Sequence, residues 1–96
     1  SASKGALISA SKSLALELAS KKIRVNSVLP AMVKTEMSTK LLEKLPNDAK
    51  IKIEDMHPLG IGTPDDVANA VVFLLSDLSK WITGTSMIVD GGYSSL

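Results

Sequence analysis

Apolar residues recur every three to four positions in two stretches of the chain, residues 5 to 19 and residues 64 to 75. This spacing gathers them on one face, so each stretch is predicted to form an amphipathic helix. The second stretch has the clearest start, because Thr63 suits the N-cap and Pro64 suits the first helical position. Two lysines follow the first stretch, where positive charge favours the carboxyl end of a helix.

Two shorter stretches are apolar on nearly both faces, which is typical of strands buried in a parallel sheet. The first covers residues 23 to 29 and is stopped by Pro30, and the second covers residues 86 to 90. The helical stretch between them predicts a right-handed crossover and parallel pairing of adjacent strands. Two parallel strands alone do not make a stable sheet, so the predicted fold class is α/β, one end of a doubly wound parallel sheet that is incomplete in this chain.

The connection over residues 31 to 58 is less regular. It contains two short runs of helical spacing, with Ser38 expected near the N-cap of the first and Asn47 as the cap of the second. Short helices between longer elements are typical of a lid, so residues 31 to 58 are interpreted as a substrate-covering segment.

Composition narrows the function classes. A net charge of +1 gives no surplus of positive charge for nucleic acid or an anionic membrane surface. No apolar run approaches the roughly 18 residues that a membrane span needs. The chain contains no cysteine, which excludes disulfides and thiolate metal sites within it and suits a reducing compartment. We therefore expect a cytoplasmic protein with neither nucleic acid nor membrane as a partner.

Three side-chain patterns suggest chemistry. The Ser-x-x-Lys pattern at Ser1 and again at Ser9 can pair a nucleophile with a base, but no companion motif follows it, so chance explains it better. His57 is the only histidine and has no partner ligands at workable spacing, so it is interpreted as a loop residue without a catalytic role, and no metal site is expected. Lys4 is different, because a lysine in the first turn opposes the helix dipole.

Four ordered motifs extend over nearly the whole chain. They are SASKGALISASKSLALELASKKIRVNSVLP, the turn PAMVKT, then GTPDDVANAVVFLLSD and finally WITGTSMIVDGGY. In this order they resemble the C-terminal part of the short-chain dehydrogenase/reductase family, especially members similar to 3-oxoacyl-[acyl-carrier-protein] reductases. The resemblance implies a Rossmann-like fold and hydride transfer between NAD or NADP and a small-molecule carbonyl or alcohol substrate.

The same resemblance implies roles for individual residues. Lys4 matches the family lysine, which lowers the pKa of a catalytic tyrosine and hydrogen-bonds the nicotinamide ribose. Pro30 would shape the turn after the strand, and Val33 would offer backbone groups to the nicotinamide carboxamide. Thr35 would add a hydroxyl near the carboxamide or the phosphates. Ala31 departs from the glycine that is usual after this proline.

The family pattern would place its catalytic tyrosine immediately before Ser1 and its Gly-rich cofactor loop earlier still. We therefore expect residues 1 to 96 to be the C-terminal segment of one NAD(P)-binding domain, a fragment that is inactive alone. The parent is expected to be a homo-oligomer, a dimer or a tetramer, because the two long helices carry more packing surface than one small sheet covers. The alternative is a non-catalytic fragment that acts only as a structural or assembly module.

Overall fold

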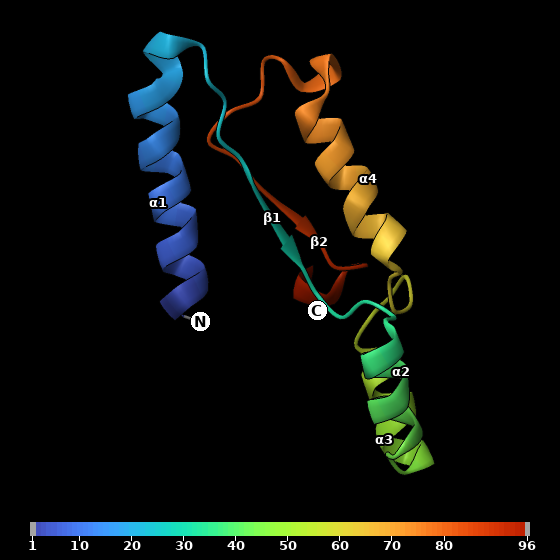
Figure 1. Cartoon of the computed structure of the whole chain (residues 1–96). Coiled ribbons are helices and arrows are strands. Elements are labelled where there is room, and N and C mark those ends of the chain that lie inside the picture. Colours follow the sequence, from blue (N-terminus) through green and yellow to red (C-terminus); the bar gives the residue numbers. More distant parts are fainter. Residues whose placement is uncertain (1, 96) are drawn as a thin grey trace. The chain divides into compact units, whose positions relative to one another are not determined.

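The computed structural model describes residues 2–95, which form two compact units. The first unit comprises Ser1–Leu29 and Asn69–Ile88, and the second comprises Pro30–Ala68 and Val89–Leu96. The elements follow one another in the order α1 (Ala2–Leu18), β1 (Ser27–Pro30), α2 (Glu36–Glu43), α3 (Asn47–Asp55), α4 (Pro64–Leu75) and β2 (Ser86–Val89) (Figure 1). The boundary between the units falls inside β1, α4 and β2, so each of these elements continues from one unit into the other.

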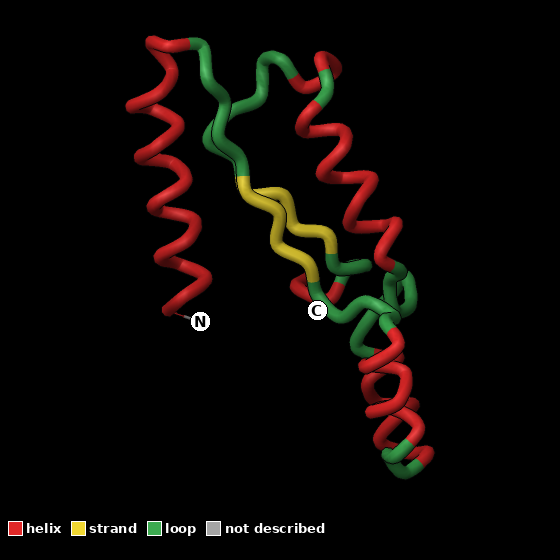
Figure 2. The backbone as a smooth tube through the Cα atoms, viewed as in Figure 1, coloured by secondary structure: helices red, strands yellow, loops and turns green. Residues whose placement is uncertain are grey.

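The two strands are adjacent and parallel, as the sequence predicts (Figure 2). The Ser27 N–H donates to the Thr85 carbonyl at 3.0 Å, and the Ala31 N–H donates to the Val89 carbonyl at 3.3 Å. Both partners advance by four residues in the same direction between these two bonds, which is the mark of a parallel ladder.

The predicted strand over residues 23 to 29 is wrong at its start, because β1 begins only at Ser27. Over the preceding residues one backbone bond joins the two segments, from the Gly84 N–H to the Val25 carbonyl at 2.8 Å, and side chains make the other bonds. The Val25 N–H donates to the Thr83 hydroxyl at 3.0 Å, and the Asn26 side chain bonds both the Ile82 carbonyl at 3.0 Å and the Thr85 N–H at 3.1 Å. Side-chain groups therefore take part where a regular ladder would use only the backbone. The second strand ends at Val89 instead of residue 90.

Helix α1 begins at Ala2 and ends at Leu18, three residues earlier and one residue earlier than predicted. A 3-10 turn follows, and Lys22 closes it in the left-handed conformation with φ 60°. The buried edge of α1 is made of small residues, Ser11 and Ala15. A Cβ added at Gly84 would stand 3.4 Å from the Ala15 Cβ, so the chain passes close to the helix at this point.

Arg24 ties the carboxyl end of α4 to the strand region of the first unit. Its guanidinium donates to the carbonyls of Leu74 at 2.8 Å and Ile82 at 3.2 Å. The fully buried Ser79 hydroxyl donates to the same Leu74 carbonyl at 2.9 Å. The last carbonyls of a helix have no partners within the helix, so these donors act as a C-terminal cap.

Helix α2 begins at Glu36, about one turn earlier than an N-cap at Ser38 would place it. Thr35 is the N-cap, and Ser38 is the third helical residue in a reciprocal capping box with it. Helix α3 starts at Asn47 itself, with Pro46 in the N-cap position and no side-chain cap. The two short helices of residues 31 to 58 are therefore present, but the residues that cap them differ from those expected.

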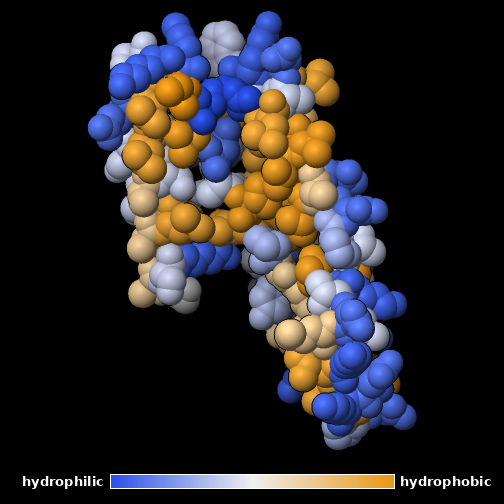
Figure 3. Space-filling model, in the orientation of Figure 1, coloured by the Kyte–Doolittle hydropathy of each residue, from blue (hydrophilic) through white to orange (hydrophobic). Residues whose placement is uncertain are grey.

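Apolar side chains cover much of the exposed surface. Among the described residues the buried apolar side chains are Ala15, Leu29 and Leu74, whereas Trp81 is 94% exposed and Leu16 is 82% exposed. Figure 3, in the orientation of Figure 1, shows hydrophobic residues gathered along α1 and along α4. Within the described part of the chain, no helix has the length and apolar character needed to cross a membrane.

Candidate functional site

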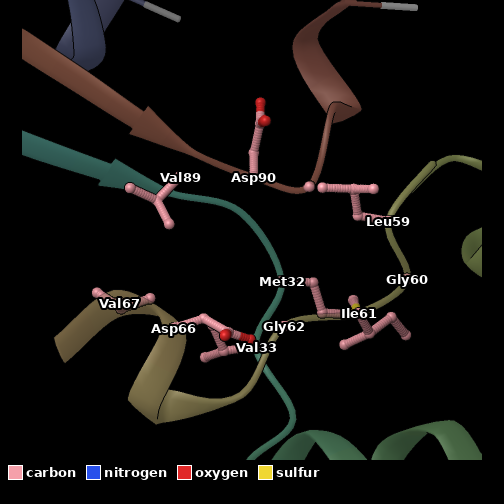
Figure 4. Close-up of a pocket in the computed structure, with 11 residues that line it drawn as sticks. Met32, Val33, Leu59, Gly60, Ile61, Gly62, Asp66, Val67, Val89 and Asp90 are labelled. Atoms are coloured by element: carbon pink, nitrogen blue, oxygen red, sulfur yellow. The ribbon is translucent and has the colours of Figure 1, made fainter. Parts of the chain in front are cut away.

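The carboxyl ends of the two strands lie beside a cavity of about 410 Å³ in the second unit (Figure 4). Its wall consists of four short pieces of chain: Met32–Val33 after β1, Leu59–Gly62 before α4, Asp66–Val67 in the first turn of α4, and Val89–Gly91 at the end of β2. In open α/β sheets, ligands bind in the crevice outside the carboxyl ends of the strands. This cavity is therefore the candidate site within the second unit.

Val33 is held by a short parallel bridge to Gly62. The Lys34 N–H donates to the Gly62 carbonyl, and the Gly62 N–H donates to the Met32 carbonyl at 3.3 Å. In a parallel bridge the flanking residues make the bonds, so the Val33 N–H and carbonyl both point away from Gly62. The carbonyl accepts from the Ser38 hydroxyl at 2.9 Å and the Thr35 N–H at 3.0 Å, while the Val33 N–H donates to none of the described residues.

Thr35 stands at the amino end of α2, where its hydroxyl oxygen accepts from the Ser38 N–H at 3.1 Å. The Ser38 hydroxyl in turn accepts from the Thr35 N–H at 2.8 Å. The Thr35 side chain is exposed, so it can cap the helix and still meet a molecule outside it. The helix end also places partial positive charge at this position.

Pro30 is the last residue of β1, and Ala31 closes the strand pairing through its N–H. Ala31 is not among the residues with a positive φ, so the turn after Pro30 does not need the glycine that is usual there. Pro30, Val33 and Thr35 thus occupy one short stretch of the second unit. Lys4 belongs to the first unit, where it lies in the exposed first turn of α1.

Asp66 is a cavity residue whose local role the sequence shows only in part. It lies in the first turn of α4, and its carboxylate accepts from the Thr63 N–H at 2.7 Å and from the Thr63 hydroxyl at 3.1 Å. A Cβ on Gly62 would stand 3.5 Å from the Asp66 Oδ2 and 3.7 Å from the Val33 side chain. The carboxylate therefore lies in the cavity wall while it fixes the start of α4 (Figure 4).

The segment Leu59–Gly62 is the part of the site that sequence reasoning missed. It supplies four residues of the cavity wall, and Gly60 adopts a left-handed φ of 84°. The only local signal is the spacing of Pro58 and Gly60, which indicates a turn but gives no position for it. Among residues 2–95, no group of three or more potential ligands could hold a metal ion.

Comparison with known proteins assigns this arrangement to a family. A family model described as enoyl-(acyl carrier protein) reductase matches residues 1–94. A solved structure of a short chain dehydrogenase family protein from Francisella tularensis superposes with a TM-score of 0.83 at 42% identity, over 98% of this chain and 42% of that one. The chain belongs to the short-chain dehydrogenase/reductase family.

Named relatives within the short-chain dehydrogenase/reductase family are enzymes. The 3-oxoacyl-[acyl-carrier-protein] reductase FabG of Rickettsia felis is 48% identical over 92 residues, which are 95% of this chain and 36% of that protein. The human (3R)-3-hydroxyacyl-CoA dehydrogenase is 45% identical over 95% of this chain and 34% of its own length. The chain thus spans about a third of these relatives, and the predicted α/β fold class and family are confirmed.

Proposed function

We propose that this chain is the C-terminal part of an NAD- or NADP-dependent reductase that converts a carbonyl group, such as that of a 3-oxoacyl thioester, into an alcohol. The family membership and the names of the relatives support an oxidoreductase. Members of the family use NAD or NADP, and nothing in these 96 residues chooses between the two. The choice is made near the second strand of a dinucleotide-binding fold, a part of the fold that these residues do not supply.

The position of the Val33 backbone is the observation that supports this proposal most directly. A nicotinamide carboxamide needs a hydrogen-bond acceptor and donor that are fixed in space, and a backbone bridge supplies them without side-chain flexibility. The parallel bridge to Gly62 turns the Val33 N–H away from Gly62, and this N–H donates to none of the described residues. We assign this N–H to the carboxamide oxygen. The Val33 carbonyl already accepts two hydrogen bonds, from the Ser38 hydroxyl and the Thr35 N–H, so the N–H is the Val33 group that we assign to the cofactor.

Thr35 and Pro30 complete this edge in the proposal. The Thr35 hydroxyl lies at the amino end of α2, where both the helix dipole and the exposed oxygen suit an amide or a phosphate. Pro30 ends the strand and sets the direction in which the chain turns towards Val33. The nicotinamide, when bound, supplies a hydride to the carbonyl carbon of the substrate.

Lys4 is assigned to the proton transfer that accompanies reduction. In the family pattern a tyrosine four positions earlier donates the proton to the carbonyl oxygen. A nearby ammonium favours the ionised phenol, so it makes that donation easier near neutral pH. Lys4 lies at an exposed position in the first turn of α1.

The test is a cofactor-oxidation assay on the longer protein that this proposal implies, with a 3-oxoacyl thioester and a simple diketone as substrates. Lys4→Ala should lower turnover on the order of 10²–10⁴-fold, the contribution of one acid/base element. Lys12→Ala is the matched control, because Lys12 is an exposed lysine on the same helix. The 96 residues alone should show no turnover, since they contain neither that tyrosine nor a Gly-rich cofactor loop. Indifference to Lys4→Ala would refute the assignment.

The competing proposal, a structural or assembly module without chemistry, rests on the exposed apolar surface. Leu16, Leu75 and Trp81 are all more than three-quarters exposed, which leaves large apolar side chains available to a partner. The same exposed apolar side chains support a homo-oligomeric full-length protein, either a dimer or a tetramer. We also propose that this protein is cytoplasmic. Reductase activity of the parent would decide for the enzyme.

A further inference from the structure

The cavity wall Leu59–Gly62 is attached to the chain that leaves β2. The Leu59 N–H donates to the Gly91 carbonyl at 2.8 Å, and the Gly60 N–H donates back to the His57 carbonyl at 2.7 Å. Residues more than thirty positions apart in the sequence therefore share one hydrogen-bonded corner of the second unit. Movement of this corner would move the cavity wall.

Two aromatic rings, those of His57 and Tyr93, pack against each other next to this corner. The rings of His57 and Tyr93 have centroids 5.1 Å apart and planes tilted by 30°, within the range of favourable aromatic pairs. His57 is only 7% exposed, and its Nδ1 lies 2.8 Å from the Ile53 carbonyl. A carbonyl only accepts hydrogen bonds, so Nδ1 carries the proton. His57 thereby connects Tyr93 to the end of α3.

Two glycines let the chain segments approach closely enough for these contacts. A Cβ on Gly91 would stand 3.1 Å from the Gly60 carbonyl oxygen, and a Cβ on Gly92 would stand 3.1 Å from the Pro58 ring. Both glycines have a positive φ, 61° and 94°. Gly91 therefore lies directly on backbone and Gly92 directly on the Pro58 ring, a fit that leaves no room for larger residues, and the pair of aromatic rings adds a further side-chain contact.

We infer that the substrate lies in this cavity, beside the edge where Val33 is assigned to the nicotinamide, and that Tyr93 is a positioning residue for it: with His57, Tyr93 holds Leu59–Gly62 in place as a wall of the cavity. The inference rests on the proposed function. Neither ring lines the cavity, so neither is expected to touch the reacting atoms. Loss of the ring pair should therefore weaken substrate binding while the chemical step keeps its rate, which appears as a raised KM at unchanged kcat.

The experiment compares Tyr93→Leu with Tyr93→Phe in the full-length reductase. Leucine removes the ring, whereas phenylalanine keeps it and removes only the hydroxyl, which plays no part in the ring pair. Tyr93→Leu should raise KM for a 3-oxoacyl thioester about two- to tenfold, the range that one aromatic pair contributes, with kcat within twofold. Tyr93→Phe should keep the KM of the unsubstituted protein.

Hydrogen exchange supplies a second measurement that does not depend on activity. The amides of Leu59 and Gly60 should exchange about two- to tenfold faster in Tyr93→Leu than in the unsubstituted protein or in Tyr93→Phe. The ladder amides of Ser27 and Ala31 should be unchanged. His57→Asn is a second way to remove the ring pair, because the asparagine amide can still donate to the Ile53 carbonyl.

The outcomes separate the two proposals. Unchanged exchange at Leu59 and Gly60 in both Tyr93→Leu and His57→Asn would overturn the inference whatever the activity. Faster exchange with an unchanged KM would also overturn it, because the wall would then have no bearing on the substrate. A parent without any reductase turnover would refute the proposed function instead, and the attachment of the wall would then be decided by hydrogen exchange.

Discussion

Removal of the Arg24 guanidinium should destabilise the first unit by several times the effect of an ordinary surface change. The side chain is half-buried and donates to the carbonyls of Leu74 at 2.8 Å, Ile82 at 3.2 Å and Ser76 at 3.5 Å. It therefore joins the end of α4 to the chain that leads into β2. Arg24→Ala breaks all three bonds at once.

The geometry sets the size of the effect. A hydrogen bond from a charged donor contributes about 1.5–3 kcal/mol, and the 3.5 Å contact is too long to count as a full bond. The Leu74 carbonyl keeps the Ser79 hydroxyl at 2.9 Å, so it does not become an unsatisfied buried acceptor. Partial exposure of the guanidinium reduces the value further. We expect Arg24→Ala to lower the free energy of unfolding by about 2–3 kcal/mol.

Urea unfolding of the full-length protein measures this free energy, with Lys12→Ala as the control for loss of one exposed positive charge. Arg24→Lys should lose about 1–2 kcal/mol, because an ammonium keeps the charge but lacks the planar fork that reaches two carbonyls together. A loss of less than about 0.5 kcal/mol in Arg24→Ala, equal to the control, would show that the cap does not stabilise this unit.

Three further changes test other parts of the structure. Gly92→Ala should destabilise by about 1–3 kcal/mol, because φ is 94° and the new Cβ would stand 3.1 Å from the Pro58 ring. Gly5→Ala should stabilise by about 0.5–1 kcal/mol, since Gly5 lies inside α1 with nothing within 4 Å of the added Cβ. Thermal unfolding checks both predictions, and a Gly92→Ala variant that is more stable than the Gly5→Ala variant would contradict them. Thr35→Val should cost about 1 kcal/mol through loss of the α2 cap, while Thr35→Ser should not. Equal Ser38 amide exchange in the two Thr35 variants would count against the cap.

Local signals explain why much of the fold could be predicted. The Thr63–Pro64 start locates α4 at the predicted residues, Pro64–Leu75. The two-faced apolar runs predict adjacent parallel strands, because only strands covered on both sides need apolar residues on both sides. The start of β1 could not be predicted, since residues 23 to 26 have the apolar pattern of a strand. Their bonds combine one backbone pair, Gly84 N–H to the Val25 carbonyl, with side-chain bonds to Thr83 and Ile82, which a pattern of residue types does not show.

The sequence predicts the candidate site only where it follows β1. The turn after Pro30 carries a motif, so the resemblance alone is enough to single out Val33 and Thr35. The wall Leu59–Gly62 has no motif of its own, because its position depends on Gly91 and Tyr93, which are distant in sequence. The sequence likewise indicates only that His57 is a loop residue. It does not show that the side chain is buried between α3 and the Tyr93 ring, because the ring comes from a distant part of the chain.

Backbone groups make up most of the candidate site. This explains why the sequence signals the site only weakly and why the site is expected to be sensitive to changes in the backbone path. The Lys34 N–H bonds the Gly62 carbonyl and the Leu59 N–H bonds the Gly91 carbonyl, so the cavity edge is fixed by backbone hydrogen bonds that do not depend on particular side chains. Side chains of different size can therefore line the same cavity, provided that the backbone path is kept. What restricts that path is the set of residues with special conformations, the glycines above all. Changes in substrate preference should thus come from the lining side chains, such as Met32 and Ile61, whereas changes at Gly91 or Gly92 should act on the whole site at once.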